Sequence, residues 1–295
     1  MTPAPPPGTP RIVVTGATGA VGSQLARRLA EPGARAPDVR LLVRDPGKVE
    51  RMGLPGTVVH ADYEDRPGIA RAMDGADAVF LVTANPLRPQ HDENIVRAAR
   101  TAGVRRVVKV SWLAVTDPEA DDLITRWNRE CEELLRASGL EWTVLRLRSL
   151  MSNTRSWASS IRSDSTVRSF GGDAPTAAVD PRDVARVAAH ALTSHGHAGR
   201  TYALSGPRPI TAREQTEELA RALGRPLGFV ELTPDQALAR WRKGLPEQVA
   251  QALLEGARRR AGGAAAQVEG DVEAVTGRAP TAFGSWADDH LGWFR

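Results

Sequence analysis

Residues 11–29 read RIVVTGATGAVGSQLARRL, and this stretch decides the fold. Its apolar start, IVV at positions 12–14, is typical of a strand buried on both faces of a parallel sheet. Gly16, Gly19 and Gly22 follow with the spacing G-x-x-G-x-x-G. We expect the first glycine to turn the chain, the second to let backbone N–H groups approach a diphosphate, and the third to let the next helix pack on the strand. The stretch therefore predicts a dinucleotide site, with the diphosphate at the positive end of that helix.

Strands and helices continue to alternate along the chain. Further strands are expected at Val39–Val43, Thr57–His60, Ala76–Val82, Val107–Val110, Trp142–Leu147 and Thr201–Leu204. Helices are expected at Ala20–Leu29, Arg66–Met73, Gln90–Ala102, Asp122–Ala137 and Val184–Leu192. Strands separated by helical stretches of this length form right-handed crossovers. The pattern predicts an α/β fold, a Rossmann-type doubly wound parallel sheet whose ligands gather at the carboxyl ends of the strands.

Composition and pattern divide the chain into three regions. Residues 1–10 are rich in proline, lack the pattern of a secretion signal and are expected to form a disordered tail. Residues 11–150 are the predicted nucleotide-binding domain, and residues 151–295 are expected to form a smaller, mostly helical substrate-binding region that partly returns to the main sheet. The elements expected in this last region are the helices Thr211–Leu223, Pro234–Arg242 and Glu247–Arg260 and the short strand Gly228–Leu232.

Composition also argues against several classes of protein. The single cysteine, Cys131, rules out a disulfide within the 295-residue chain and favours a reducing, cytoplasmic setting. No apolar run approaches the ~20 residues of a membrane span, and the six histidines lack metal-ligand spacing, so we predict no membrane association and no metal. The net charge of +4 comes from scattered arginines, and the one dense cluster, Arg258–Arg260, is interpreted as a solvated helix face rather than a nucleic-acid site. We expect a monomer or a homodimer.

The residue that ends the second strand indicates which nicotinamide cofactor binds. In dinucleotide folds a carboxylate at this place binds the free ribose 2′-hydroxyl, whereas an arginine accommodates a 2′-phosphate. Arg44 stands here, and Lys48 lies four residues on. Because a guanidinium suits a phosphate, the sequence predicts NADP(H). The alternative is an arginine that points into water beside Asp45.

Several further motifs can be compared with known families. They are Gly16-Ala17-Thr18-Gly19-Ala20-Val21-Gly22, Val43-Arg44-Asp45, Asp62, Val107-Val108-Lys109-Val110-Ser111, Ser138-Gly139-Leu140 with Trp142-Thr143, Met151-Ser152-Asn153, and the closing Thr276-Gly277-Arg278 with Phe283 and Trp286. Together they resemble the NmrA-like branch of the atypical short-chain dehydrogenases/reductases. That family includes NADPH-dependent quinone, azo-dye and isoflavone-type reductases, and also non-catalytic proteins that sense NADP(H). The resemblance implies that the protein binds NADP(H), and that it either reduces a substrate with it or senses it without turnover.

The strand ends and the resemblance together assign the cofactor contacts. Asp62 matches the family's adenine-contacting carboxylate, although an aspartate that caps its own turn is an equal alternative. Met151 and Asn153 match the segment beside the nicotinamide. Lys109 is hard to bury within VVKVS unless its amine reaches a ligand or a carboxylate, and we expect it to reach the cofactor. The expected cofactor-binding residues are Gly16, Thr18, Gly19, Ala20, Val21, Gly22, Arg44, Lys48, Asp62, Thr83, Asn85, Lys109, Met151 and Asn153.

The usual proton donor of the short-chain reductases is missing from this chain. Most members protonate the substrate with a tyrosine whose pKa is lowered by a lysine four residues later. The two tyrosines here, Tyr63 and Tyr202, are not followed by such a lysine. In the helix where the pair is expected, the matching positions are Trp127/Cys131 or Asn128/Glu132. The sequence therefore argues against alcohol dehydrogenation at a simple carbonyl.

Two functions are compatible with that absence. In the first, NADPH reduces a quinone, enone, imine or azo acceptor that stabilises the resulting anion, and the product takes its proton from water. In the second, the protein senses NADP(H) without turnover, or uses the pocket for redox-neutral chemistry. We favour the reductase, with Ser111 and Asn128 as candidate catalytic residues. Ser111 falls where the family's catalytic serine lies, and a serine that caps a turn is the alternative.

Three tryptophans are the candidate substrate-binding residues. Trp112, Trp127 and Trp157 are expected to open toward one mouth, where a flat aromatic or conjugated small molecule could stack. For Trp127, which shares a helix face with several leucines, packing in the core is the favoured interpretation. Cys131 lies on the same face and is interpreted as a small buried hydrophobe rather than a nucleophile.

Overall fold

The predicted doubly wound sheet is confirmed. The computed structural model describes residues 9–31, 36–263 and 265–295, so most of the tail expected at residues 1–10 lies outside the described residues. Among them, seven strands form one sheet in the order β3-β2-β1-β4-β5-β6-β8. The strands are β1 (Arg11–Thr15), β2 (Asp38–Val43), β3 (Thr57–His60), β4 (Ala78–Leu81), β5 (Arg106–Trp112), β6 (Glu141–Leu147) and β8 (Arg200–Leu204).

The order of the strands places the ligand site. β1 pairs in parallel with β2 on one side and with β4 on the other, so that Val14 lies opposite Leu41 and Phe80. β2 pairs in parallel with β3, and β4 with β5. The strand order reverses between β1 and β4, and ligands of such sheets bind in the crevice outside the carboxyl ends of the strands at this reversal. The glycine loop begins there, directly after Thr15.

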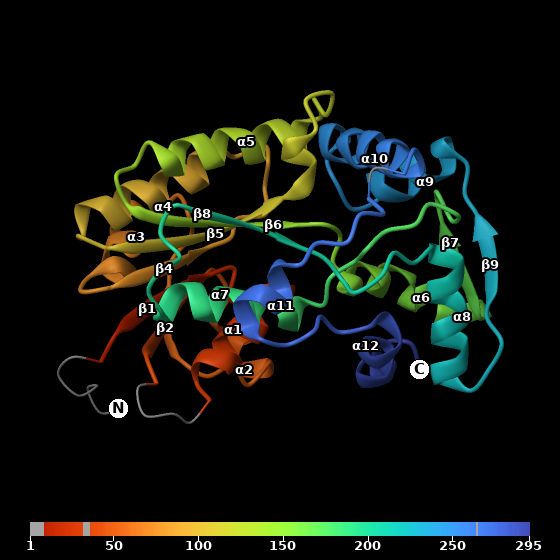
Figure 1. The fold of residues 1–295 in the computed structure, drawn as a ribbon, viewed down its shortest axis with the longest axis horizontal. Helices are drawn as coiled ribbons and strands as arrows, with labels where there is room; N and C mark the ends of the chain where they lie inside the picture. Colours follow the sequence, from red (N-terminus) through yellow and green to blue (C-terminus); the bar gives the residue numbers. More distant parts are fainter. Residues whose placement is uncertain (1–8, 32–35, 264) are drawn as a thin grey trace. The chain divides into compact units, whose positions relative to one another are not determined.

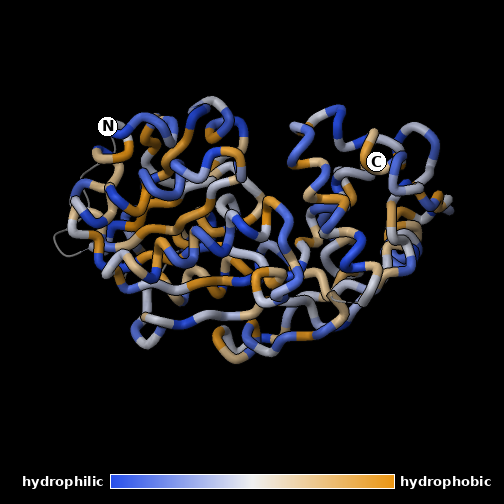
Figure 2. The backbone as a smooth tube through the Cα atoms, turned by 90° about the horizontal axis from the view of Figure 1, so that it is seen from above, coloured by the Kyte–Doolittle hydropathy of each residue, from blue (hydrophilic) through white to orange (hydrophobic). Residues whose placement is uncertain are grey.

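Helices cover both faces of the sheet (Figure 1). On one face lie α3 (Arg66–Met73), α4 (Gln90–Thr101) and α5 (Leu123–Arg136), and on the other lie α1 (Ala20–Leu29), α2 (Pro46–Arg51) and α7 (Pro181–Thr193). The first three helices share one hydrophobic core with the sheet, in which Ile69, Ile95 and Leu135 are fully buried. The apolar strands stand out against the hydrophilic outer helix faces in Figure 2. Burial on both faces is the reason that these strands are nearly continuous apolar runs.

One short helix forms where the sequence indicates a break. The second strand ends at Val43, and α2 begins at Pro46, so only Arg44 and Asp45 separate the two elements. The Asp45 carboxylate accepts a hydrogen bond from the Lys48 N–H at 3.1 Å, and Pro46 occupies the first turn. An aspartate N-cap followed by proline starts a helix as readily as it ends a strand.

The chain forms two compact units. Unit 1 comprises the described residues up to Ser111, then Trp127–Arg146 and Val184–Tyr202; unit 2 comprises Trp112–Arg126, Leu147–Asp183 and Ala203–Arg295. A single boundary near residue 150 therefore describes the division only in part. Within unit 1, Arg106 of β5 donates to the carbonyl of Leu192 in α7 at 2.7 Å, which holds this later segment to the sheet.

Unit 2 is built mostly from helices. Its elements are η1 (Leu113–Thr116), η2 (Met151–Trp157), α6 (Ala158–Asp164), β7 (Thr166–Ser169), α8 (Ala212–Leu223), β9 (Gly228–Glu231), α9 (Pro234–Arg242), α10 (Glu247–Ala261), α11 (Asp271–Thr276), α12 (Phe283–Asp289) and η3 (Leu291–Trp293). β7 and β9 pair in parallel as a separate two-stranded sheet. The expected strand and helices between Thr211 and Arg260 are confirmed. None of the helices in the described part of the chain combines the length and apolarity needed to cross a bilayer.

Candidate functional site

The glycine loop has the tight geometry that its spacing predicts. Gly16 adopts a φ of +58°, which makes the turn off β1. A Cβ added at Gly22 would lie 2.3 Å from the carbonyl oxygen of Gly16, a distance that no side chain tolerates. The atoms nearest to that Cβ belong to Gly16 and Ala17, which directly follow β1. The missing side chain of Gly22 therefore lets α1 pack closely at the end of that strand.

The amino end of α1 is open to an anion. Gly19, in an extended conformation, precedes the helix without a side-chain cap, and no acidic residue lies in the first turn. The Gly19 N–H is bonded to the Gly16 carbonyl at 2.8 Å, so the second glycine uses its own N–H to close the loop. The N–H groups of Ala20, Val21 and Gly22 lie in the first helical turn, where a helix supplies no acceptor of its own. These groups and the bare glycine backbone fit the diphosphate of a dinucleotide.

Tyr63 holds the glycine loop in place, a role that the sequence interpretation missed. Its hydroxyl oxygen accepts a hydrogen bond from the Gly16 N–H at 2.8 Å, and its ring meets His91 edge to face. Burial raises the pKa of Tyr63, although the bond from Gly16 acts in the opposite direction. The sequence analysis considered Tyr63 only as an acid. The position of Tyr63 shortly after β3 could have indicated this contact, because β3 and β1 end at the same edge of the sheet.

The residues expected around the adenosine ribose lie together in unit 1. The Nε atom of Arg44 lies 3.8 Å from an Asp62 carboxylate oxygen, and the two side chains are 73% and 45% exposed. Asp62 also accepts a hydrogen bond from the Glu64 N–H at 3.0 Å, so the alternative in which it caps its own turn is also observed. Lys48 is exposed on α2. Arg44 is thus a solvent-accessible guanidinium at the end of β2, and its contact with a 2′-phosphate stays a prediction.

A buried ion pair joins three of the candidate residues. Lys109 and Asp92, each about 1% exposed, lie 3.3 Å apart. Asp92 also accepts hydrogen bonds from the hydroxyl of Thr83 at 2.7 Å and from the indole N–H of Trp127 at 3.1 Å. Of the two partners that the sequence allows for the Lys109 amine, a ligand or a carboxylate, the structure shows the carboxylate. The contacts with Asp92 lie inside unit 1, and the expected ligand contacts of Thr83, Lys109 and Trp127 stay predictions.

Asp92 could have been found from the sequence. It shares the buried face of α4 with Ile95, Val96 and Ala99, at the spacing of one helical stripe. A carboxylate on an apolar stripe requires a buried partner, and Lys109 in the apolar strand β5 is the matching cation. Each element thus carries a charged residue in an apolar setting, but only the fold shows that Asp92 and Lys109 lie opposite each other.

Two other candidates in unit 1 have local roles. The side-chain oxygen of Asn85 accepts a hydrogen bond from the Leu87 N–H at 3.1 Å and so shapes the loop after β4. Cys131 is a buried free thiol, and burial raises its pKa far above the usual range. Its interpretation as a small buried hydrophobe agrees with this environment.

The candidate catalytic serine is bonded to a buried carboxylate. The Ser111 hydroxyl donates to Glu132 at 2.6 Å, and Glu132 is about 1% exposed. Arg146 donates twice to the same carboxylate, at 2.6 and 3.0 Å, and Arg136 once at 2.6 Å. Burial by itself raises the pKa of Glu132, but the hydrogen bonds from Arg146, Ser111 and Arg136 outweigh it and hold the pKa below the usual range.

This network occupies the place of the missing tyrosine and lysine. Of the two pairs on α5, Asn128/Glu132 includes the residue that contacts Ser111. Glu132 stays ionised at neutral pH, so it is not a proton donor. The proton of Ser111 is directed to Glu132 rather than to a ligand, and Asn128 is buried on the same helix. Catalytic roles for Ser111 and Asn128 stay predictions.

One candidate ligand cavity lies within unit 2. It has a volume of about 710 Å³, in the range of small-molecule sites. Trp112, Trp157 and Asn153 line it, so two of the three candidate tryptophans share one cavity and the third, Trp127, belongs to unit 1. Met151 does not line it: its side chain packs in the core of unit 2, and its N–H and carbonyl are both bonded to the protein.

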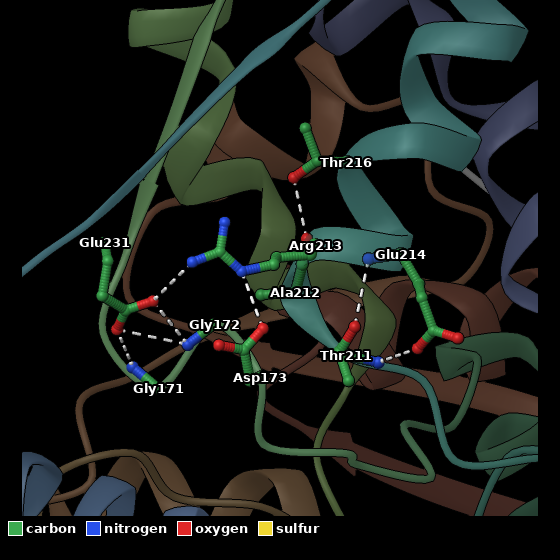
Figure 3. A network of polar contacts seen from close by, with 9 residues as sticks. All are labelled: Gly171, Gly172, Asp173, Thr211, Ala212, Arg213, Glu214, Thr216 and Glu231. Carbon is green, nitrogen blue, oxygen red and sulfur yellow. Dashed lines mark hydrogen bonds and ion pairs between the residues drawn. The ribbon is translucent and has the colours of Figure 1, made fainter.

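A polar network fixes one wall of this cavity (Figure 3). The Glu231 carboxylate accepts hydrogen bonds from the N–H groups of Gly171 and Gly172, at 2.7 and 3.0 Å. Arg213 at the start of α8 donates to Asp173 at 2.7 Å and lies 3.9 Å from Glu231. The segment after β7, which includes the cavity-lining Gly171, is thereby tied to β9 and α8.

Comparison with known proteins identifies the family. The family model described as NAD(P)H-binding matches residues 16–195. The chain is 51% identical to a (4-alkanoyl-5-oxo-2,5-dihydrofuran-3-yl)methyl phosphate reductase from Streptomyces griseus, over 96% of this chain and 99% of that protein. It is 33% identical to an NAD(P)H azoreductase from Xenophilus azovorans, over 96% and 99%. A solved NADPH-dependent quinone oxidoreductase from Escherichia coli matches with a TM-score of 0.78 at 25% identity, over 95% and 99% of the two chains.

These matches agree with the geometry of the glycine loop. The family match begins at Gly16, where the loop leaves β1, and it covers the strands and helices that surround the open end of α1. The predicted cofactor, NADP(H), is confirmed at the level of an NAD(P)H-binding domain. The chain therefore belongs to the NAD(P)H-binding family, in its NmrA-like branch of atypical short-chain dehydrogenases/reductases, and is an NAD(P)H-dependent oxidoreductase.

Proposed function

We propose that this protein uses NADPH to reduce the ring C=C bond of a conjugated lactone that carries an alkanoyl group and a methyl phosphate. The observation that carries the proposal is the 51% identity, over nearly the full length of both chains, to the reductase of a (4-alkanoyl-5-oxo-2,5-dihydrofuran-3-yl)methyl phosphate. The missing tyrosine–lysine pair supports it, because an acceptor of this kind needs no strong protein acid. The azoreductase and the quinone oxidoreductase fit the same chemistry, since their acceptors also stabilise the anion that forms.

The proposed reaction balances without a protein acid. Bound NADPH supplies a hydride to the ring carbon that bears the phosphomethyl group. The electron pair of the C=C bond moves to the neighbouring carbon, where the lactone carbonyl and the alkanoyl carbonyl both delocalise the charge. A proton from water then completes the saturated product. Because the substrate carries its own stabilisation, the protein's task is to orient the acceptor and keep its conjugated carbons in place.

The residues of the chain have separate tasks in this scheme. The glycine loop and the first turn of α1 hold the diphosphate, and Arg44 holds the 2′-phosphate. Trp112 and Trp157 line the cavity in unit 2 that receives the acceptor. Glu132, fixed by Arg136 and Arg146, keeps its charge and holds the Ser111 hydroxyl, so its task is to position β5 and α5 rather than to move a proton.

The test measures the rate of NADPH oxidation with each member of a panel of acceptors. The alkanoyl lactone phosphate is expected to be reduced with a kcat/KM at least about a hundredfold above that of a simple ketone, a difference of about 2.7 kcal/mol in transition-state stabilisation. Mass spectrometry of the product should show the gain of two hydrogens. Tight NADPH binding without turnover of any lactone, quinone or azo acceptor would instead favour the sensor. Equal rates with the simple ketone would contradict the proposal.

The cofactor preference gives a first variant. Arg44→Glu is expected to weaken NADPH binding about 10- to 100-fold, because a phosphate–guanidinium contact of about 1.5–3 kcal/mol is replaced by repulsion. Binding of NADH should change less than about threefold. Calorimetric titration with both cofactors measures the effect, and Arg51→Ala on the exposed face of α2 is the control. An equal loss for NADH and NADPH would show that Arg44 does not read the 2′-phosphate.

A further inference from the structure

One arginine at the cavity in unit 2 has no counterion. The side chain of Arg260, near the end of α10, has no hydrogen bond or ion pair within the described residues, and the residue is exposed. Its neighbour Arg259 is paired with Asp122, so the nearest carboxylate is already used. Desolvation of the guanidinium and the charge of Arg259 lower the pKa of Arg260, although the residue as a whole is exposed. Such a cation gains most from an anion that arrives with a ligand.

Arg260 stands where two cavities meet. The cavity of about 710 Å³ and a second of about 260 Å³ are both lined by this residue. The other residues common to both are Trp112, Ser149, Asn153 and Leu253. A ligand in either cavity can therefore present an anionic group to the same guanidinium while Ser149 and Asn153 offer uncharged hydrogen-bonding groups.

A second guanidinium lines the larger cavity without a carboxylate. Arg240 of α9 donates to the carbonyl oxygens of Ser156 and Arg168, at 2.7 and 3.5 Å, and no carboxylate of the described residues pairs with it. Arg168, which also lines the cavity, is neutralised by Asp164 at 2.6 Å. The cavity thus carries two uncompensated positive charges.

The rest of the larger cavity is apolar. Trp157, Phe170 and Trp241 line it together with Ile210 and Leu245. An alkyl chain buried there is stabilised by the removal of its CH₂ groups from water. The combination of guanidinium groups that lack a carboxylate partner and an aromatic, aliphatic wall suits a molecule with a phosphate at one end and an alkyl chain at the other.

We propose that Arg260 is the phosphate-binding and specificity-determining residue of the acceptor site, assisted by Arg240, and that the aromatic wall binds the alkyl chain. A guanidinium binds phosphate through two parallel N–H···O bonds, which gives both affinity and orientation. The inference rests on the proposed function for the identity of the substrate. The recognition of alkyl phosphates by this cavity can be measured without turnover.

The experiment compares octyl phosphate with octanol in calorimetric titrations of the full chain with NADP⁺ bound. The wild-type protein should bind octyl phosphate at least about tenfold more tightly than octanol, a difference of about 1.4 kcal/mol. Arg260→Ala should remove that difference and leave octanol binding unchanged, and Arg260→Lys should restore part of it. Arg258→Ala, on the exposed face of the same helix, is the matched control and should behave like the wild type.

Two results of these titrations would overturn the inference. One is that octanol binds to the wild type as tightly as octyl phosphate; the other is that Arg260→Ala, with unchanged thermal unfolding, retains the full preference for the phosphate. Binding of octyl phosphate through Arg260, in a protein that reduces no lactone phosphate, would leave the inference standing and refute the proposed function. Reduction of lactones with and without the phosphate at equal KM would refute the inference and leave the reductase activity standing.

Discussion

Glu132→Ala is expected to lower the free energy of unfolding by about 1.5–3 kcal/mol, because it leaves two half-buried guanidinium groups and a buried hydroxyl without their carboxylate. Glu132 is about 1% exposed and accepts hydrogen bonds from Arg146, Arg136 and Ser111. Removing the carboxylate leaves two guanidinium groups beside each other and a hydroxyl without an acceptor. Urea unfolding at neutral pH measures the loss.

The matched control lies one residue further along α5. Glu133 is exposed, so Glu133→Ala should change the free energy of unfolding by less than about 0.5 kcal/mol. Glu132→Gln keeps the shape and the acceptor for Ser111 but removes the charge, and its cost should fall between the two. A loss for Glu132→Ala no larger than for Glu133→Ala would show that the buried pair contributes nothing.

The same carboxylate should make stability depend on pH. The folded protein holds the pKa of Glu132 below its ordinary value of 4.5, because the bonds from Arg146 and its partners outweigh burial. The stabilisation is therefore complete at pH values above 4.5 and is lost as the pH falls through the lowered value. Glu132→Gln should remove this part of the acid dependence, which is checked by unfolding both proteins at neutral pH and below pH 4.5.

Gly22→Ala is expected to weaken NADPH binding by at least about a hundredfold, or about 2.7 kcal/mol. The new Cβ would lie 2.3 Å from the carbonyl oxygen of Gly16, and both are held by backbone that cannot rotate away. The amino end of α1 must then move off the loop, which separates the N–H groups that bind the diphosphate. Overpacking of this kind also costs about 1–3 kcal/mol of stability.

Alanine substitutions at two other glycines serve as comparisons for the loss of NADPH binding. At Gly19 an added Cβ meets the Gly16 oxygen at 3.1 Å, so Gly19→Ala should be milder than Gly22→Ala. At Gly292 nothing lies within 4 Å, and Gly292→Ala should leave NADPH binding unchanged. Fluorescence titration with NADPH ranks the three variants. If Gly22→Ala bound NADPH like the wild type, the loop could not be the diphosphate site.

Local signals were sufficient to predict the turn of the glycine loop and the elements on either side of it. The apolar run before Gly16, the glycine spacing and the helix after it all lie within 19 residues, and each element constrains the backbone next to it. The helix Pro234–Arg242 was predicted with its observed bounds for the same reason, since Thr233 and Gln236 form a capping box within four residues. Arg44 could be assigned because its place depends only on the strand that it ends.

Other parts of the site depend on residues far apart in the chain. The sequence interpretation directed Lys109 to the cofactor, but Asp92 of α4 lies opposite it and takes its charge. It directed Ser111 to the acceptor, but Glu132, 21 residues on, accepts its proton. Met151 matched a family segment but points into the core of unit 2.

The sequence by itself determined the doubly wound sheet, the turn of the glycine loop and the class of cofactor, because each follows from the order of neighbouring residues. The tertiary structure alone decided which buried charges neutralise one another and which guanidinium stays free. Coulomb attraction and burial act between groups that the folded chain brings within a few ångströms, whatever their separation in sequence. That is why Arg258–Arg260 looks like one solvated charge cluster in the sequence, yet contains an arginine paired with Asp122 and, beside it, one left for a ligand.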